Sequence, residues 1–231
     1  MASANTGVEG HYEARGEAAW VAIASLAVLV LLALVSLKED WELVELPWWI
    51  WLVLAVPSLL LCGDLLLGSV GMGVASTRRG ALVLLGAMVA GNVTGLVLLI
   101  AALITTSSDK IGGGQLLCTA AIIWLANIGV FGVWFWEIDD DGPVARANRD
   151  RKGAKPDFKF PQDDNPGLAR DGWRPRIWDY LYVSLTGASA FSPTDTMPLT
   201  LKAKLLVGLE STVSLVIVVL VTARAVNVLG S

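Results

Sequence analysis

Apolar residues form long unbroken runs along most of this chain, and short polar connections separate them. Five of these runs cover 18–37, 47–70, 81–104, 115–136 and 203–228. Each is close to the ~20 residues that an α-helix needs to cross a ~30 Å hydrocarbon core. A sixth run, 177–191, is too short to cross comfortably at ~1.5 Å per residue. The pattern predicts an all-α integral membrane protein with five transmembrane helices and one short re-entrant or half-crossing helix.

The stretch 137–176 breaks this pattern, because it holds nine acidic side chains, nine basic side chains and five of the nine prolines. Such a stretch cannot bury enough apolar surface to fold alone, and its charges keep it out of the hydrocarbon. We therefore expect a four-helix membrane region over 1–136, a charged extramembrane loop over 137–176 and a C-terminal module over 177–231.

Composition narrows the function classes further. The chain is 55% hydrophobic with a mean hydropathy of +0.62, which excludes an ordinary soluble domain. Its single histidine, His11, lies in the polar N-terminal segment, so a catalytic triad or a multi-histidine metal site is not expected. Cys62 and Cys118 lie in apolar segments and are interpreted as small buried hydrophobic residues. We predict no enzyme, no metal or other cofactor, and no nucleic-acid partner.

The distribution of Lys and Arg predicts the orientation. With the N-terminus in the cytoplasm, 12 basic residues of the first four helices and their connections lie inside and 2 lie outside. Cytoplasmic connections carry the excess of basic residues in membrane proteins. The prediction is a multi-pass plasma-membrane protein whose loop 137–176 is cytoplasmic and available to a soluble partner.

A few polar side chains interrupt the apolar runs, and each needs a reason, because an ionisable group in hydrocarbon costs ~2.5 kcal/mol or more. They are Asp64, Asn92, Asn127, Glu210 and Ser214. One interpretation is a polar path or a proton- or cation-linked site between helices. The other is hydrogen bonding across the bundle that fixes how the helices pack. The sequence leaves both open.

The last 55 residues have a distinctive order. A short helix that carries Tyr182, Ser184 and Thr186 is followed by a polar turn that ends in an Asp and a Pro, and then by a long helix with one Glu. This order resembles the pore helix, selectivity filter and inner helix of the potassium-channel-like superfamily, in particular its bacterial ion-channel-like members. The resemblance implies an ion path along the following residues: Ser192, Thr194, Asp195, Glu210 and Ser214.

The filter region departs from that family. A potassium filter reads Thr-x-Gly-Tyr-Gly-Asp, whereas residues 190–195 read Ala-Phe-Ser-Pro-Thr-Asp. Both glycines are missing and Pro193 fixes its own φ, so we do not expect a normal ladder of carbonyl ligands. With Phe-Ser-Pro-Thr-Asp-Thr-Met-Pro at 191–198, the whole chain is similar to a group of bacterial multi-pass membrane proteins without an established function. A channel topology would also place the loop outside, against the basic-residue count.

Three functions remain open at this point. The first is passive cation conduction by a homo-oligomer in the lipid bilayer, built around the C-terminal module. The second is a non-conducting membrane scaffold or assembly partner that binds a cytoplasmic protein through 137–176. The third is a transporter that uses Asp64 and Glu210 as a proton-linked pair.

Overall fold

The structure is a computed structural model that describes 78–105, 113–142, 155–167, 169–192 and 195–229, together with Arg146 and some earlier positions. The earlier positions are 23, 26–27, 30, 33–34, 37, 52–53, 55–60 and 63. The first two expected helices, 18–37 and 47–70, therefore lie largely outside the described residues. The count of five transmembrane helices stays a prediction.

The described part of the chain is mostly helical, as predicted. Its elements in chain order are α3 (Arg78–Thr105), α4 (Gly113–Ile138), the 3-10 helix η1 (Asp139–Asp141), β1 (Phe158–Lys159), α6 (Pro161–Asp164), α7 (Ile177–Ala190), β2 (Met197–Pro198) and α8 (Leu201–Leu229). The helices α3, α4, α7 and α8 agree within three residues at every end with four of the predicted apolar runs.

Two of the described helical stretches are long and apolar enough to cross a membrane, namely Leu117–Asp141 and Leu201–Ala223. Helix α3 contains a shorter apolar stretch, Leu82–Leu98. Length and composition of these two helices support membrane association of the chain, in agreement with its overall composition.

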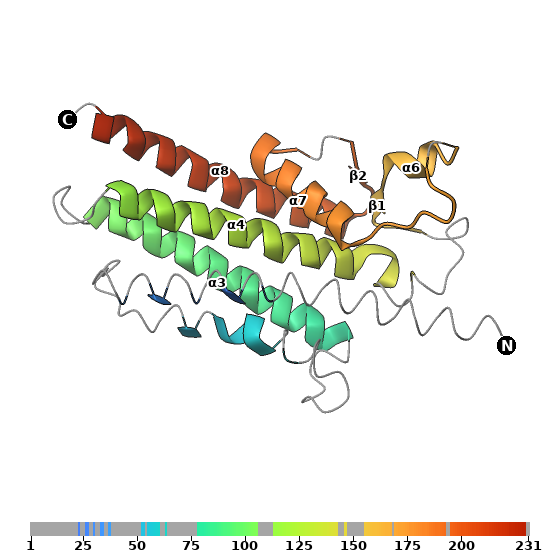
Figure 1. The fold of residues 1–231 in the computed structure, drawn as a ribbon, viewed down its shortest axis with the longest axis horizontal. Coiled ribbons are helices and arrows are strands. Elements are labelled where there is room, and N and C mark those ends of the chain that lie inside the picture. Colours follow the sequence, from blue (N-terminus) through green and yellow to red (C-terminus); the bar gives the residue numbers. More distant parts are fainter. Residues whose placement is uncertain are drawn as a thin grey trace.

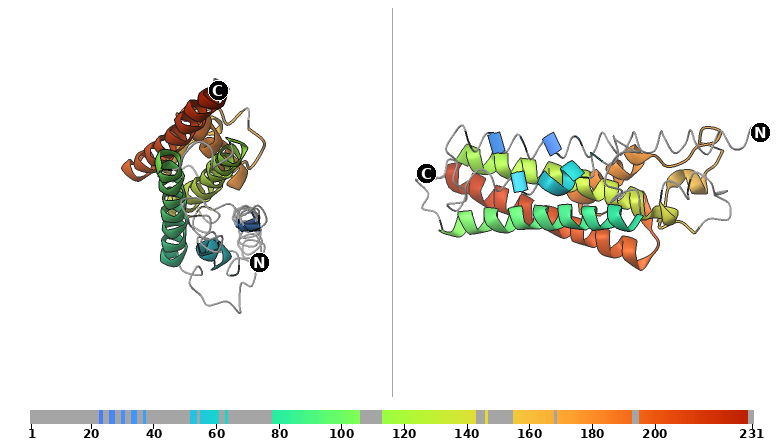
Figure 2. Two further views of the ribbon diagram at one scale, coloured as in Figure 1. Left: turned by 90° about the vertical axis from the view of Figure 1, so that its left-hand side faces the viewer. Right: turned by 90° about the horizontal axis from the view of Figure 1, so that it is seen from below.

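Helix α4 is the centre of the described bundle. It contacts α3, α7 and α8, and the three long helices α3, α4 and α8 run side by side (Figures 1 and 2). Most positions in the second half of α4 are buried, including Phe131, Phe135 and Trp136. A helix with neighbours on several sides must be apolar nearly all round, which is why the α4 sequence shows little alternation of apolar and polar faces.

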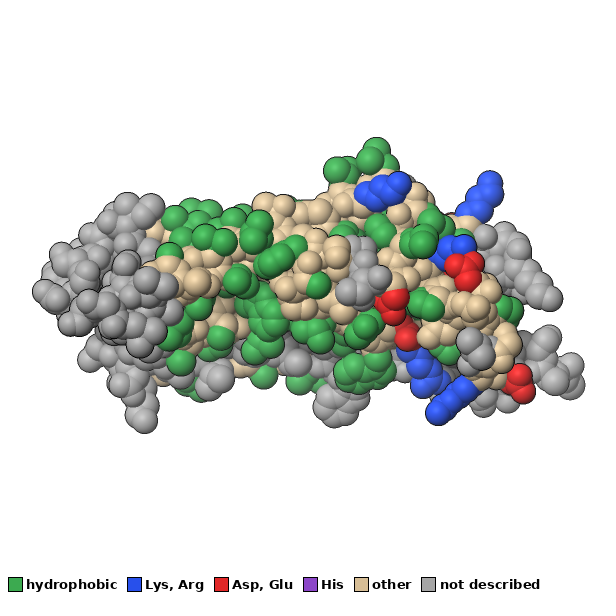
Figure 3. All heavy atoms as spheres, turned by 90° about the horizontal axis from the view of Figure 1, so that it is seen from above, with side chains coloured by type: hydrophobic (Ala, Val, Ile, Leu, Met, Phe, Trp, Pro, Cys, Tyr) green, Lys and Arg blue, Asp and Glu red, His purple; other side chains and the backbone are tan. Residues whose placement is uncertain are grey.

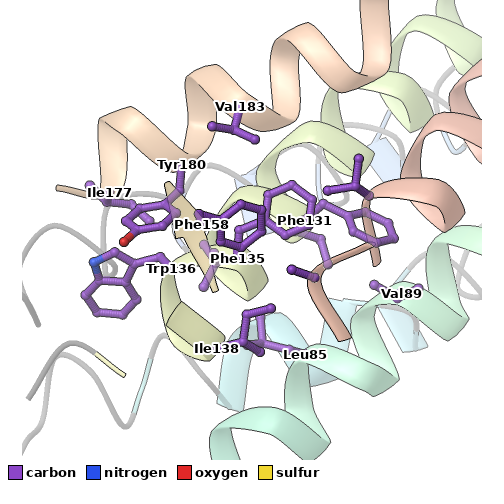
Figure 4. Close-up of a cluster of buried hydrophobic side chains, with 14 of the residues drawn as sticks. Leu85, Val89, Phe131, Phe135, Trp136, Ile138, Phe158, Ile177, Tyr180 and Val183 are labelled. Carbon is purple, nitrogen blue, oxygen red and sulfur yellow. The ribbon is translucent and has the colours of Figure 1, made fainter. Parts of the chain in front are cut away.

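Aromatic side chains fill the core where α4, α7 and the charged stretch meet (Figure 4). The rings of Phe135 and Phe158 lie 5.1 Å apart between centroids, and Phe158 is 6.1 Å from the ring of Tyr180. Phe160 meets the same tyrosine edge to face at 5.3 Å. Edge-to-face and tilted pairs at these separations are favourable beyond the area that they bury. Segment 137–176 therefore contributes two phenylalanines to the core of the bundle.

A close approach of α4 and α7 depends on Gly132. A Cβ atom at this position would lie 2.6 Å from Leu181 Cδ2 and 3.1 Å from Leu181 Cα. The second atom is backbone, so a side-chain rotation alone does not relieve the contact. A glycine is therefore required at the point where α7 crosses α4.

Asp139 anchors the beginning of α7 at the end of α4. Its carboxyl is fully buried and accepts hydrogen bonds from Tyr180 Oη, from the backbone N of Asp157 at 2.7 Å and from the backbone N of Phe158 at 3.0 Å. Arg146 Nη1 lies 3.8 Å from Asp139 Oδ2 and donates to the backbone oxygen of Asp139 at 2.8 Å. A buried carboxyl needs such partners because leaving it unpaired is costly.

A second anchor joins the charged stretch to the beginning of α8. Asp157 is buried, and its Oδ2 lies 2.7 Å from Lys202 Nζ. Its other oxygen accepts a hydrogen bond from Thr200 Oγ1, and its backbone oxygen accepts from Leu199 N at 2.8 Å. Lys202 Nζ also donates to the carbonyl of Ile138 at 3.2 Å, at the end of α4. The end of α4 and the beginning of α8 are thus held together.

The chain after α7 returns to the end of the bundle at which α7 begins. Strand β2 pairs antiparallel with β1, in the register Phe158 with Pro198 and Lys159 with Met197. The same β1 contributes the core residue Phe158 that packs on Tyr180 in the first turn of α7. Helix α7 and the residues after it therefore form a hairpin that opens toward this end (Figure 1), which we call the α7 hairpin (177–198).

Charged side chains gather at that same end. In Figure 3 the Lys, Arg, Asp and Glu side chains lie over the part of the surface formed by the charged stretch and the beginning of α8, and the rest of the described surface on this face is largely apolar or neutral. Exposed apolar side chains include Val83 and Val97 on α3 and Leu205 on α8. This division is typical of a helical bundle with an apolar body and one charged end.

We predict that Gly132→Ala destabilises the bundle. The added methyl would overpack the contact with Leu181 at a cost of about 1–3 kcal/mol, against a gain of about 1 kcal/mol in helix propensity. The matched control is Gly86→Ala in α3, whose Cβ would meet only Trp134 at 4.0 Å. The thermal unfolding temperature in detergent should fall for Gly132→Ala and stay level or rise for Gly86→Ala. Equal changes of the unfolding temperature in the two variants would contradict the close approach of α4 and α7 at Gly132.

Candidate functional site

Glu210 is the centre of a polar network inside the bundle. It lies on α8, is fully buried, and its Oε1 accepts a hydrogen bond from Ser184 Oγ on α7. Ser184 is also fully buried and donates to the carbonyl of Ile128 on α4 at 2.8 Å. Three helices meet at this pair of side chains.

The second carboxyl oxygen of Glu210 is buried and makes no hydrogen bond within the described part of the chain. It faces Gly187 on α7, where a Cβ atom would lie 3.0 Å from it. A side chain at position 187 would therefore require the Glu210 carboxyl to move by a few tenths of an ångström. None of the ion pairs among the described residues involves Glu210. Within the described part of the chain, the hydroxyl of Ser184 is thus the side-chain hydrogen-bond partner of the Glu210 carboxyl.

Asn127 extends the network across α4 to α3. Its Nδ2 donates to Ser214 Oγ on α8 at 3.0 Å and lies 3.4 Å from the backbone oxygen of Glu210. Its Oδ1 accepts from Asn92 Nδ2 on α3 at 2.9 Å. Asn127 and Ser214 are fully buried. One side chain on the central helix thus links both flanking helices by hydrogen bonds.

The end of α7 is held by side chains of two other helices. Ser211 Oγ on α8 donates to the carbonyl of Gly187 at 3.3 Å, and Trp124 Nε1 on α4 donates to the carbonyl of Ala188 at 3.5 Å. The last carbonyls of a helix have no partner within the helix, and these two donors supply it. Trp124 lies 14 residues before the end of α4, or about 21 Å along that helix. The α7 hairpin therefore reaches about the middle of the bundle.

The structure separates the residues that the sequence assigned to an ion path. Glu210 and Ser214 lie inside the bundle together with Asn92 and Asn127. Ser192 and Asp195 follow the end of α7 and are exposed. Thr194 and Asp64 lie outside the described residues, so the structure does not give the separation of Asp64 and Glu210 that a proton-linked pair requires.

Sequence analysis did not assign Ser184 and Gly187 to a site. Both belong to the buried face of α7, and with Tyr180 they follow the spacing i, i+4 and i+7. Small and hydroxyl residues at helical spacing on one face were the available signal, since such residues allow close approach and hydrogen bonding between membrane helices. Their partner on another helix could not be read from that spacing.

The network is suited to fixing helix positions, because its members bond to one another or to backbone carbonyls across helices. Among the described residues no group of three or more His, Cys, Asp or Glu side chains could hold a metal ion. Of the described residues that the sequence assigned to an ion path, Ser192 and Asp195 are the exposed ones.

We predict that Asn127→Leu destabilises the bundle by about 1–3 kcal/mol, because Asn92 and Ser214 would each lose a buried hydrogen-bond partner. The control is Thr94→Val on α3, whose hydroxyl is exposed and bonds to Ala90 of its own helix at 2.8 Å. In detergent, Asn127→Leu should unfold at a lower temperature than Thr94→Val. Equal loss of stability in Thr94→Val and Asn127→Leu would argue against stabilisation of the bundle by the Asn127 hydrogen bonds.

No protein-family model, curated protein or solved structure matches this chain. The resemblance of 177–214 to a pore module therefore rests on the order of its residues, and function has to be argued from the geometry of the α7 hairpin and of the Glu210 network.

Proposed function

We propose that this chain is a multi-pass plasma-membrane protein in which the α7 hairpin re-enters the bilayer and forms part of a passive cation path. The observation that carries the proposal is the return of the chain: α7 begins beside β1, and β2 pairs with β1 after the turn. Helix α7 has 14 residues. Its length of about 21 Å is short of a ~30 Å core.

The electrostatics of α7 favour cations at its inner end. The C-terminal end of a helix carries a partial negative charge equivalent to roughly half an elementary charge. In α7 this end, Ala190, is directed toward the middle of the bundle, and Asp179 in the first turn complements the opposite end. Ser192 and Asp195 follow, and both residues are exposed. Such an arrangement attracts a cation and repels an anion.

Side chains would set any selectivity of this path. Phe191 follows α7 with φ 57°, a left-handed conformation that non-glycine residues rarely adopt. A potassium filter places glycines where such backbone geometry is needed, and this chain has Phe and Pro in the region instead. The path is therefore assigned to Ser192, Thr194 and Asp195 and not to a carbonyl ladder. Weak discrimination among monovalent cations follows from this assignment.

The orientation of the hairpin follows from its connection to the charged stretch. Both arms of the hairpin begin or end beside residues of 137–176, through Asp139 with Tyr180 and through the pairing of β2 with β1. The excess of Lys and Arg favours a cytoplasmic location for that stretch. The proposed hairpin therefore re-enters from the cytoplasmic face, opposite to the side used by potassium channels.

A second candidate is a non-conducting membrane scaffold. The observation that favours it is the burial of Glu210 and Ser214, which were expected on the path and instead hold helices together. In this function the hairpin is a packing element, and the loop 137–176 binds a cytoplasmic partner. Crosslinking from exposed loop positions such as Asp171 would identify that partner. If no other protein is crosslinked to the loop, this function is contradicted.

Ion flux in liposomes tests the proposed path. Purified protein should let K⁺ and Na⁺ move down their gradients, and Asp195→Asn should lower that flux several-fold because a negative side chain is lost from the path. Asp171→Asn is the matched control, since this carboxyl is exposed in the charged stretch. It should leave the flux unchanged.

Two results would overturn the cation path. The first is a membrane that stays tight under every cation gradient with wild-type protein folded and inserted. The second is an equal loss of flux in Asp195→Asn and Asp171→Asn. Either result would leave the scaffold as the better explanation of the hairpin.

A further inference from the structure

Oxygen atoms of two α8 side chains lie beside Gly187 in the last turns of α7. A Cβ atom placed on Gly187 would be 3.0 Å from Glu210 Oε2 and 3.9 Å from Ser211 Oγ. The backbone oxygen of Gly187 accepts a hydrogen bond from the same hydroxyl at 3.3 Å. A carboxyl, a hydroxyl and a carbonyl oxygen thus lie close together between the two helices. We call Glu210 Oε2, Ser211 Oγ and Gly187 O the Gly187 oxygen cluster.

Glu210 Oε2 is the unsatisfied member of this cluster. The side chain is fully buried, and this oxygen makes no hydrogen bond within the described part of the chain. The same part of the chain offers Glu210 no basic partner. A buried carboxylate without a compensating charge is costly, so a positively charged ligand at Oε2 would stabilise the folded bundle.

The other two members of the cluster also have lone pairs to offer. Ser211 Oγ uses its hydrogen in the bond to Gly187 O, which leaves its lone pairs for a ligand. A carbonyl oxygen has two lone pairs, of which that bond uses one. A proton is shared by two oxygen atoms at most, whereas a metal cation binds several at once. The grouping of three oxygens therefore favours a metal cation.

Charge and spacing favour a small monovalent cation. Hard cations take oxygen ligands, and one carboxylate balances one positive charge. Among the described residues no group of three or more His, Cys, Asp or Glu side chains could hold a metal ion of higher charge. Na⁺ is close in size to Ca²⁺, and two ligands at right angles and about 2.4 Å from such an ion are about 3.4 Å apart. The 3.3 Å between Gly187 O and Ser211 Oγ agrees with this spacing.

The cluster can be reached without opening the core. Glu210 is fully buried, but Ser211 beside it is only half-buried. Ser189 and Ala190, which end α7 just after Gly187, are exposed. An ion can therefore approach from the end of α7 and pass Ser211 to meet the carboxyl.

We propose that the Gly187 oxygen cluster binds one sodium ion. Glu210 Oε2, Ser211 Oγ and Gly187 O are its protein ligands, and water from the side of Ser211 completes its coordination. The bound ion neutralises the buried carboxylate and links α7 to α8. These residues differ from those of the proposed cation path, so the inference requires no conduction.

Equilibrium binding of radioactive Na⁺ tests this site. Full-length protein is purified in detergent with choline chloride as the only salt. We expect saturable binding that unlabelled NaCl displaces and choline chloride at the same concentration does not. Glu210→Gln should abolish this binding because the ligand charge is lost, and Ser211→Ala should weaken it at least several-fold.

The matched control for Ser211→Ala is Ser189→Ala. Ser189 is exposed on α7, and its hydroxyl donates to Leu185 O of its own helix at 2.7 Å. This variant should bind Na⁺ as the wild type does. Gly187→Ala is a further variant that keeps every polar side chain, and its methyl group would take the position beside Oε2, so it should also lose binding.

Thermal unfolding provides a second measurement on the same proteins. A ligand that binds only the folded state raises the unfolding temperature in proportion to the logarithm of its concentration above the dissociation constant. NaCl, compared with equal choline chloride, should raise this temperature for the wild type and Ser189→Ala. It should have several-fold less effect on Ser211→Ala.

Two results would overturn the sodium site. The first is the absence of displaceable Na⁺ binding by folded wild-type protein, which would mean that a proton or an internal water satisfies Glu210. The second is equal Na⁺ binding by Ser211→Ala and Ser189→Ala. The flux test is separate: Na⁺ binding by a protein that keeps liposomes tight would support this site and refute the cation path, and flux without such binding would do the reverse.

Discussion

Helix α7 is too short to cross a bilayer, and its buried face must find partners over its whole length of about 21 Å. The contact between Glu210 and Ser184 holds the middle of α7, and side chains of Ser211 and Trp124 bond to the carbonyls nearer its inner end. A buried carboxyl has few acceptable surroundings, because desolvation is costly unless a hydrogen-bond partner is present. Gly187 lies against that carboxyl, and a Cβ atom at this position would come within 3.0 Å of its oxygen.

The charged stretch secures the other end of the hairpin. Asp139 binds the first turn of α7 through Tyr180, and Asp157 binds the beginning of α8 through Thr200 and Lys202. Two aromatic residues of the same stretch, Phe158 and Phe160, fill the core between them. A segment whose composition suggests a solvated loop thus supplies the anchors for the C-terminal module. Its described part and the hairpin form one structural unit.

The sequence predicted the helices well and their contacts poorly. Apolar runs predict the bounds of α3, α4, α7 and α8, because a helix in an apolar setting excludes charges over its length. Asn127 was recognisable as a polar residue at depth, and hydrogen bonding across the bundle was one of two open interpretations. Helix α4 is apolar nearly all round, so its sequence does not indicate which face Asn127 shares with which neighbour.

The same limit applies to the carboxyl groups. Glu210 was assigned to a path on the basis of its position in the last helix, but the structure turns it toward Ser184. Nine acidic residues lie between 137 and 176, and composition alone does not distinguish the buried Asp139 and Asp157 from the exposed Asp171. Burial of these groups depends on partners that are distant in sequence. Pairings of this kind need a three-dimensional arrangement to become visible.

The sidedness of the two ends of the hairpin tests the central claim most directly. Asp171 precedes α7 and Met197 follows the return, and both are exposed. In a background of Cys62→Ala and Cys118→Ala, Asp171→Cys and Met197→Cys would be treated with a membrane-impermeant thiol reagent in sealed vesicles of one orientation, with permeabilised vesicles as the full-labelling control. The account predicts that both cysteines react from the same side. Labelling from opposite sides would mean that α7 crosses the membrane and would contradict a re-entrant hairpin.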